Sequence, residues 1–210
     1  MQKLTLLMLL SLLAAVPARS DTAQAVFAGG CFWCMESAYQ ELEGVTDVIS
    51  GFTGGELPNP TYKGNHDGHY EAVLVTYDPN VLSYQDLLDH YWVNIDPFDD
   101  RGQFCDKGFS YRAAIFAEGD EQMQLAVASR DAVVAQFPDQ QVVTQVLPAN
   151  RFWPVEEYHQ DYYKQDGLVL TRFGPRSKAS AYKLYRESCG RDARVDALWG
   201  DAAPFTKGHS

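Results

Sequence analysis

The feature that most restricts the fold of this chain is a pair of glycines between a predicted strand and a predicted helix. Residues 23–28 have a strand pattern, Gly29 and Gly30 follow, and residues 32–43 have the apolar spacing of a helix. Residues 45–52 return to a strand pattern. The first part of the domain is therefore predicted to be a strand–helix–strand unit with the sequence GGCFWC at its first turn.

Two further segments extend this alternation. Residues 71–77 (EAVLVTY) alternate between two faces and are rich in β-branched side chains, and Asp78-Pro79 ends the strand. Ser83 is a suitable N-cap for a following helix, whose apolar residues recur every three or four positions until the break before Pro97. We expect this helix to bury one face.

The second half of the chain continues the pattern. We expect a strand from Tyr111 (YRAAIFA), a helix over residues 120–136 and a strand from Gln141 (QVVTQVL). The packed side of the helix is predicted to carry three apolar residues, Met123, Val127 and Val134. Together these elements predict an α+β domain, a two-layer sandwich with a mixed, ferredoxin-like sheet and long functional loops.

The length and composition indicate one domain. The chain has 210 residues and is 46% hydrophobic, which is enough for one well-buried core. We expect a single catalytic domain over residues 21–210, in which residues from about 167 to 210 form an extended C-terminal tail. Glycine and proline cluster between Gly51 and Gly68, which predicts a long functional loop there.

Residues 1–20 are predicted to be a secretory signal peptide. Lys3 precedes an apolar run, and a small-residue boundary ends at Ser20. The run is shorter than the roughly 20 residues that span a bilayer, so we expect cleavage after Ser20 and no stable membrane anchor. The protein is therefore expected to be exported, to the periplasm rather than to the extracellular medium.

The charge balance excludes two classes of partner. The formal net charge of the chain is −11 at pH 7, and residues 1–20 contain basic but no acidic side chains, so their removal makes the protein more acidic. Nucleic acid and anionic membrane surfaces are therefore poor partners.

The GGCFWC sequence places a thiol where a helix can change its chemistry. Cys31 is predicted at the start of the helix, where unpaired N–H groups and the partial positive charge of the helix stabilise a thiolate. The glycines would let the backbone approach a substrate closely. Cys34 lies one turn further on, near enough for a disulfide with Cys31. Phe32 and Trp33 would wall an apolar pocket beside the thiol.

Structural interpretations of these residues compete with a functional one. Cys31 and Cys34 could be a buried pair or a static disulfide. A zinc site would need two further ligands at suitable spacing, and Cys105 and Cys189 stand alone. We therefore favour redox chemistry and no metal site. Three histidines are interpreted as hydrogen-bonding residues and two tyrosines as packing residues: His66, His69 and His159, and Tyr158 and Tyr162.

Six motifs follow one another along the chain: GGCFWCME, GFTGG, NPTY, GHYEAV, QFCDKGFSYR and EEYHQDYY. In order and spacing they resemble the peptide methionine sulfoxide reductases of the A type, as an exported member with a CFWC active-site motif. The resemblance covers roughly residues 26–163. Several long motifs in order are far more specific than a single CxxC sequence.

This resemblance implies an activity and a partner. It implies thiol-dependent reduction of the S epimer of methionine sulfoxide, free or in proteins, to methionine, which repairs oxidised proteins. It implies no bound cofactor, because the electrons come from an external dithiol such as a thioredoxin-like protein. We expect a monomer.

The resemblance also assigns roles to matching positions. Cys31 resembles the nucleophile, Glu71 the acid near the sulfoxide oxygen, and Tyr111 a hydrogen-bond donor to that oxygen. Burial would raise the pKa of Glu71 so that its carboxyl keeps its proton at neutral pH. The residues that the resemblance places against the substrate are Phe32, Trp33, Phe52 and Asp106. Taken alone, Glu71, Asp106 and Tyr111 could be ordinary edge, turn and strand residues.

Three features depart from the family pattern. Phe52 stands where many relatives have tyrosine in GYTGG, and the lost hydrogen bond is expected to cost about 1 kcal/mol of transition-state stabilisation. Cys34 stands where many members carry glycine. The C-terminal segment lacks the glycine-rich stretch in which others keep a resolving cysteine. We predict that Cys34 resolves the sulfenic acid on Cys31, while Cys105 and Cys189 stay open as resolving, recycling or paired residues.

Two other functions remain open at the level of the sequence. A general exported thiol–disulfide oxidoreductase would also use Cys31 and Cys34, but it would not need Glu71 and Tyr111. A secreted binding module would instead hold its four cysteines in two static disulfides, Cys31–Cys34 and Cys105–Cys189.

Overall fold

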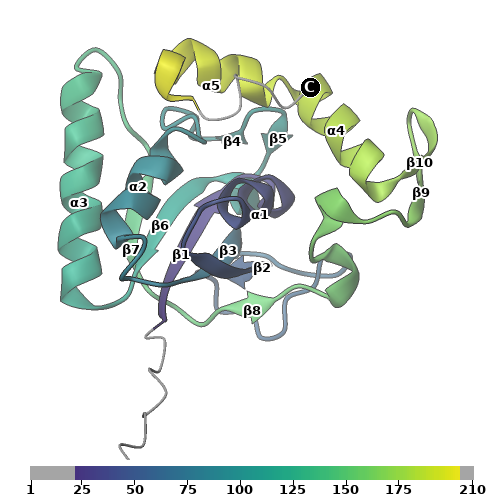
Figure 1. The fold of residues 1–210 in the computed structure, drawn as a ribbon, viewed down its shortest axis with the longest axis horizontal. Helices are drawn as coiled ribbons and strands as arrows, with labels where there is room; N and C mark the ends of the chain where they lie inside the picture. Colours follow the sequence, from purple (N-terminus) through teal and green to yellow (C-terminus); the bar gives the residue numbers. More distant parts are fainter. Residues whose placement is uncertain (1–21, 204–210) are drawn as a thin grey trace, which may run out of the picture.

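The structure, a computed structural model, describes residues 22–203, so the predicted signal peptide lies outside the described residues. Its centre is a six-stranded sheet in the order β7-β6-β1-β3-β2-β8 (Figure 1). The strands are β1 (Ala23–Gly29), β2 (Val45–Thr53), β3 (Tyr70–Tyr77), β6 (Ala113–Ala117), β7 (Gln145–Pro148) and β8 (Trp153–Pro154). Neighbouring strands are antiparallel except β6 and β7, which are parallel. The predicted α+β class and mixed sheet are confirmed, and the finer two-layer, ferredoxin-like description stays a prediction.

Three helices connect these strands. They are α1 (Phe32–Gln40) between β1 and β2, α2 (Tyr84–Trp92) after β3, and α3 (Gly119–Gln136) between β6 and β7. Ser83 caps α2 as predicted, because its side chain accepts the N–H of Asp86 at 3.2 Å and the Asp86 carboxylate accepts the N–H of Ser83 at 2.9 Å. None of the helices between residues 22 and 203 combines the length and hydropathy needed to cross a bilayer.

The structure differs from the sequence prediction at several boundaries. Helix α1 ends at Gln40, three residues early, and the last predicted strand is regular only from Gln145. Tyr111 lies in the short 3-10 helix η1 (Phe109–Tyr111) rather than in β6. Two small strands, β4 (Gly102–Gln103) and β5 (Asp106–Lys107), precede it. Tyr111 therefore lies in a short helix before β6, and not on a strand.

The packed face of α3 was predicted only in part, since Met123 and Val127 are half-buried. Its buried residues are Ala126, Ser129 and Val133, whereas Val134 is 44% exposed. The indole N–H of Trp92 in α2 donates to the Ser129 hydroxyl at 2.6 Å, which turns the Ser129 side of α3 toward α2. A buried indole needs such a partner, and this tertiary contact sets the rotation of the helix.

Aromatic side chains hold α1 and α2 against the sheet. The Phe27 ring of β1 stacks on Tyr39 of α1 at 5.1 Å and on Tyr91 of α2 at 5.3 Å. Both tyrosine hydroxyls are satisfied inside the core, since Tyr39 donates to the Leu87 carbonyl and Tyr91 donates to the Ala28 carbonyl. This packing fixes the end of β1, from which the GGCFWC sequence begins.

The segment expected as a C-terminal tail is folded across the end of β1 as far as residue 203. It contains the hairpin strands β9 (Leu168–Thr171) and β10 (Gly174–Ser177), then α4 (Lys178–Cys189) and α5 (Arg191–Trp199) (Figure 1). A covalent bond and several hydrogen bonds hold it there. A disulfide joins Cys189 to Cys105, and the buried guanidinium of Arg191 donates to the carbonyls of Asn94 at 2.8 Å and Gly29 at 3.3 Å.

We expect the double substitution Cys105→Ser and Cys189→Ser to lower the free energy of unfolding by about 2–4 kcal/mol, because the bridge closes a long loop in the unfolded chain. The two cysteines are 84 residues apart. Urea unfolding monitored by circular dichroism would measure the loss. Each single substitution breaks the same bond, so it should lower the free energy of unfolding by as much as the double substitution does. If the losses of the two single variants instead sum to the loss of the double variant, the two sulfurs contribute independently.

Candidate active site

The turn between β1 and α1 is built by packing on both glycines. Gly30 has φ +85°, a conformation that favours glycine, and a Cβ there would lie 2.6 Å from the Cβ of Gln103. A Cβ on Gly29 would lie 2.4 Å from the sulfur of Met35. The glycines are thus required by their own protein neighbours. The expectation that they let the backbone approach a substrate closely stays a prediction.

The Glu71 side chain lies against the start of α1. It is in β3, paired in register with Phe52 of β2, and its carboxyl oxygen accepts the Phe32 N–H at 3.1 Å. Burial raises the pKa of Glu71 to about 8, with an opposing contribution from the Phe32 N–H and a further increase from Asp106. At neutral pH the Glu71 carboxyl is therefore largely protonated. It is hydrogen-bonded to the residue that directly follows Cys31.

Two tyrosine hydroxyls lie near this carboxyl. Burial raises the pKa of both Tyr62 and Tyr111, and the charges of Glu71 and Cys31 raise each further. Both phenols therefore keep their protons and are hydrogen-bond donors at neutral pH. Tyr62 was missed in the sequence analysis, although it lies within the NPTY motif that supported the family resemblance.

Asp106 is the second acidic group near Cys31. The Tyr185 hydroxyl of α4 donates to its carboxylate. Burial raises the pKa of Asp106, and the Tyr185 hydrogen bond and the Arg191 charge oppose this shift. With Asp106, all eight residues predicted for the site belong to one region of the structure: Cys31, Phe32, Trp33, Cys34, Phe52, Glu71, Asp106 and Tyr111.

Aromatic rings form a wall around Phe32 and Trp33. The Trp33 ring stacks on Tyr162 with centroids 4.0 Å apart, and Phe32 packs edge-on against Phe52 at 5.9 Å. Tyr62 contacts both Phe32 and Trp33. The predicted packing role of Tyr162 is confirmed. An apolar wall of this kind suits a thioether or a methyl group and excludes water from the thiols.

His159 completes this wall without a hydrogen bond. It is 3% exposed, its ring lies 4.1 Å from that of Tyr62, and neither ring nitrogen has a partner among the described residues. Burial lowers its pKa to about 4, so the imidazole is neutral at pH 7. The prediction of a hydrogen-bonding residue is wrong for His159. It holds for His66, which contacts the Thr61 carbonyl at 3.1 Å, and for His69, which accepts the Gly55 N–H at 3.3 Å.

The two thiols of GGCFWC are free and share a buried site. The pKa of Cys34 is lowered to about 6 by a hydrogen bond from Cys31, against the effect of burial, and with help from the charges of Arg191 and Arg186. The same hydrogen bond, together with burial, raises the pKa of Cys31 above its usual value. The pair therefore holds one proton at neutral pH, and the negative charge rests on Cys34.

The resting thiolate on Cys31 stays a prediction, and the surrounding charges favour Cys34 as the anion. Cys31 faces the acidic groups Glu71 and Asp106, which oppose a negative charge on its sulfur. Cys34 faces cations that α4 and α5 bring in from the far end of the sequence. Both sulfurs lie at the start of one helix, so the surrounding side chains decide which of them ionises.

The remaining cysteines form the Cys105–Cys189 disulfide. One group of potential metal ligands occurs among residues 22–203, and it consists of these two cysteines and Asp106. Their sulfurs are bonded to each other, so they are not thiolate ligands. The structure also has no Cys31–Cys34 disulfide, which the interpretation as a static binding module would require.

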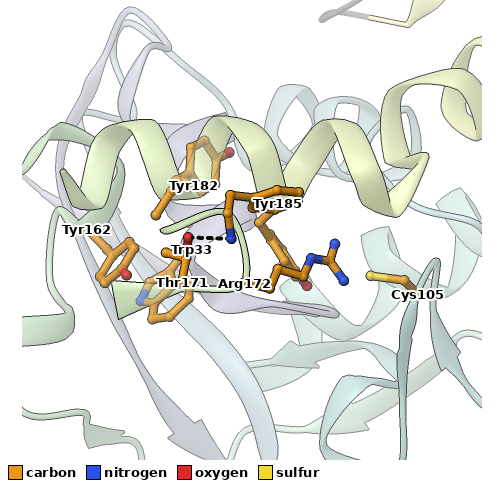
Figure 2. Close-up of a pocket in the computed structure, with 9 residues that line it drawn as sticks. Trp33, Cys105, Tyr162, Thr171, Arg172, Tyr182 and Tyr185 are labelled. Atoms are coloured by element: carbon orange, nitrogen blue, oxygen red, sulfur yellow. Dashed lines mark hydrogen bonds between the residues drawn. The ribbon is translucent and has the colours of Figure 1, made fainter. Parts of the chain in front are cut away.

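A cavity of about 250 Å³ adjoins Trp33 and the disulfide-bonded Cys105, and neither Cys31 nor Cys34 is among the residues that line it (Figure 2). Trp33 and Tyr162 line one part of it, and Tyr182 and Tyr185 of α4 line another. The sulfurs themselves are nearly covered, since Cys31 is 6% exposed and Cys34 is 2% exposed. The cavity has the size and apolar lining of a site for one side chain.

Comparisons with known proteins agree with one another. A family model described as peptide methionine sulfoxide reductase matches residues 23–188. The chain is 48% identical over 186 residues to peptide methionine sulfoxide reductase MsrA 2 of Caulobacter vibrioides, covering 87% of this chain and 88% of that protein. It is 43% identical over 184 residues to peptide methionine sulfoxide reductase MsrA of Bacillus pumilus, covering 84% and 95%. The structure of methionine sulfoxide reductase A of Corynebacterium diphtheriae aligns with a TM-score of 0.65 at 28% identity, over 72% of this chain and 78% of that one.

We expect the ultraviolet absorbance of thiolate to titrate with an apparent pKa of about 6 in the reduced protein, because Cys34 is stabilised as the anion by Cys31 and two arginines. The Cys34→Ser variant should lose this titration, and its remaining thiol should ionise only well above neutral pH. The matched Cys31→Ser variant should keep a thiolate near neutral pH. The opposite pattern in the two variants would assign the charge to Cys31.

Proposed function

The chain belongs to the peptide methionine sulfoxide reductase family and is an oxidoreductase that acts on methionine sulfoxide, and from this premise we propose that it reduces the S epimer, free or in proteins, to methionine. The observation that carries the proposal is the protonated Glu71 carboxyl beside the Cys31 sulfur at the start of α1. A sulfoxide oxygen is a poor leaving group until it is protonated, so the reaction needs an acid in this place.

In the first step, the Cys31 sulfur attacks the sulfur of the substrate. The Cys31 proton passes to the Cys34 thiolate, to which it is already hydrogen-bonded, so that Cys34 acts as the base. The sulfoxide oxygen takes its proton from Glu71, and Tyr62 and Tyr111 donate hydrogen bonds to it. The sulfur–sulfur bond so formed and the substrate S–O bond then break as the protonated oxygen moves to the Cys31 sulfur, and the products are the thioether, a sulfenic acid on Cys31 that carries the Glu71 proton, and the Glu71 carboxylate.

In the second step, Cys34 resolves the sulfenic acid. Its sulfur attacks the Cys31 sulfur, the S–O bond breaks, and water leaves as the Cys31–Cys34 disulfide forms. Arg186 and Arg191 support this step because they favour the anionic form of the attacking sulfur. The Cys105–Cys189 disulfide supports the same assignment, since those two sulfurs are already bonded to each other.

An external dithiol closes the cycle. Two thiols of a thioredoxin-like protein reduce the Cys31–Cys34 disulfide by exchange and become a disulfide themselves. No bound cofactor enters these steps. We further propose that the enzyme is exported, to the periplasm rather than to the medium, on the basis of its N-terminal sequence. We also propose that it is a monomer.

The substitution Cys31→Ser should abolish turnover of a methionine S-sulfoxide peptide with dithiothreitol as reductant, because the attacking sulfur is removed. The unsubstituted protein should reduce the S epimer and leave the R epimer unchanged. Chromatographic measurement of methionine from each epimer would show both results. Turnover of both epimers, or undiminished turnover by the variant, contradicts the proposal.

Activity should increase as the pH rises past about 6, where Cys34 loses its proton, and decrease as it rises past about 8, where Glu71 loses its proton. The substitution Glu71→Gln should lower kcat by about 10²–10⁴-fold and remove the alkaline decrease, because an amide cannot supply the proton. Single-turnover rates across this pH range would test both limbs.

The same variant separates the proposal from a general thiol–disulfide oxidoreductase. Glu71→Gln should leave thiol–disulfide exchange by Cys31 and Cys34 intact, which insulin reduction would measure. If insulin is reduced rapidly and sulfoxide is not reduced by the unsubstituted protein, the oxidoreductase interpretation is correct.

A further inference from the structure

Helix α1 carries a buried carboxyl group that takes no part in the proposed reaction. Glu36 is fully buried, and burial raises its pKa to about 7. The Ser50 hydroxyl lies close to this carboxyl, but neither the hydroxyl nor the second Glu36 oxygen makes a well-aligned hydrogen bond among residues 22–203. A buried carboxyl with an unmatched oxygen costs free energy that an apolar side chain of similar size would avoid. Its presence on the helix that begins at the thiols therefore points to a role.

The first oxygen of Glu36 holds the backbone of a turn. It accepts the Asp161 N–H at 2.9 Å. Asp161 lies between the 3-10 helices η2 (Glu157–His159) and η3 (Tyr162–Lys164), and its φ of +53° places it in the left-handed region. A residue other than glycine persists in that region where its surroundings hold it. Glu36 supplies such a contact from inside the core.

This turn places two rings against Trp33. Tyr162, directly after Asp161, stacks on Trp33 with centroids 4.0 Å apart, and Figure 2 shows the two rings together. His159, two residues before Asp161, has its ring centroid 5.5 Å from that of Trp33. Tyr162 also packs against the cluster that contains Cys31, and its pKa is raised by burial and further by Cys31. The backbone angle at Asp161 therefore decides how far the aromatic wall stands from the attacking sulfur.

A neighbouring residue of α1 contacts the same segment in a different way. Gln40 lies one helical turn after Glu36. Its amide donates to the Asp161 carboxylate at 2.9 Å and accepts from the Tyr163 hydroxyl and the Lys164 ammonium at 2.6 Å each. These are contacts with side chains at a half-buried position, whereas Glu36 contacts the backbone of the turn in the core. Gln40 is therefore the matched control for a test of Glu36.

We propose that Glu36 is a positioning residue for the substrate. By accepting the Asp161 N–H it holds the two rings on Trp33, and the wall so formed binds the methyl and methylene groups of the methionine sulfoxide side chain. The proposal rests on the proposed function and adds a residue outside the reacting groups. Because Glu36 belongs to the helix that begins at Cys31, it fixes the wall relative to the attacking sulfur.

The expected effect of Glu36 falls on substrate affinity. An apolar wall contacts the substrate in the ground state and in the transition state alike, so its loss raises KM and leaves kcat unchanged. The largest contributions that lower the pKa of Cys34 come from Cys31 and two arginines, so removal of Glu36 should also leave the thiolate titration near pH 6 in place. A residue that only stabilised the fold would not produce this separation.

The test replaces Glu36 in two ways and the control residue in one. Glu36→Gln keeps an oxygen that accepts the Asp161 N–H, and Glu36→Leu removes the acceptor at similar volume. Gln40→Ala removes the side-chain contacts of the control position. The substrate is a blocked methionine S-sulfoxide with dithiothreitol as reductant, and urea unfolding checks that each variant is folded. If Glu36→Leu does not fold, Glu36→Ala removes the same acceptor and takes its place.

The variant Glu36→Leu should raise KM about tenfold with kcat unchanged, because a buried N–H loses its partner and the turn shifts. The variants Glu36→Gln and Gln40→Ala should keep KM within about twofold of the unsubstituted protein. Tyr162→Ala should raise KM by itself. Its combination with Glu36→Leu should raise KM by less than the product of the two single effects, because Glu36 acts through that ring.

Three results overturn the positioning role. They are an unchanged KM in Glu36→Leu, an equal increase in Glu36→Gln or Gln40→Ala, and a decrease confined to kcat. Full multiplication of the Tyr162→Ala and Glu36→Leu effects overturns it as well. The proposed function fails separately: an unsubstituted protein that reduces no sulfoxide contradicts both proposals, whereas an active protein whose KM is unchanged in Glu36→Leu contradicts only the role of Glu36.

Discussion

The hydrogen bond from the Phe32 N–H to the Glu71 carboxyl is the contact on which the site depends. It joins the first turn of α1 to the middle of the sheet, and both partners are buried. Burial makes the charged carboxylate unfavourable, so the same environment that fixes the position of Glu71 also keeps it protonated. A shift of α1 along β3 would separate the acid from the Cys31 sulfur and expose both to water. The packing of Phe27 on Tyr39, which holds α1 in place, therefore matters to the chemistry as well as to stability.

The charges around the thiol pair are divided between two sides. Glu71 and Asp106 lie on the side of Cys31, and the arginines of α4 and α5 lie on the side of Cys34. A helix N-terminus favours anions at both positions, so it does not distinguish them. The side chains do, and they leave the proton on the sulfur that must attack and the negative charge on the sulfur that receives that proton. In the proposed reaction one arrangement thus serves both steps, because Cys34 is first a base and then a nucleophile.

Much of the fold could be predicted from local patterns. Alternation along β1, β2 and β3, and the Ser83 cap of α2, depend on neighbours in sequence, and the structure has them as expected. The rotation of α3 could not be predicted, because a hydrogen bond between Trp92 and Ser129 decides it.

The site is limited in the same way, because contacts between segments that are distant in sequence leave no local pattern. Glu71 and Tyr111 were found because they lie inside recognisable motifs. Tyr62 also lies inside one, but it belongs to the loop between β2 and β3, and no local pattern predicts where such a loop places a side chain. Arg186 and Arg191 carry no local signal at all. They influence Cys34 only because the chain returns across the end of β1, and no pattern within α4 or α5 reveals that contact.

The C-terminal segment links these properties. Through Arg186 and Arg191 it sets the charge of Cys34, and through Tyr185 it holds Asp106. Tyr182 of α4 packs against both thiols, so access to their sulfurs depends on where α4 lies. Its C-terminal end is tied to Cys105 by the disulfide, and its N-terminal end continues from the hairpin. The N-terminal end of α4 is held by hydrogen bonds instead, since the Lys178 ammonium donates to the Tyr158 carbonyl and to the Gln165 side chain at 2.6 Å each. The helix that covers the thiols is therefore fixed at both ends, by a covalent bond at one and by hydrogen bonds at the other.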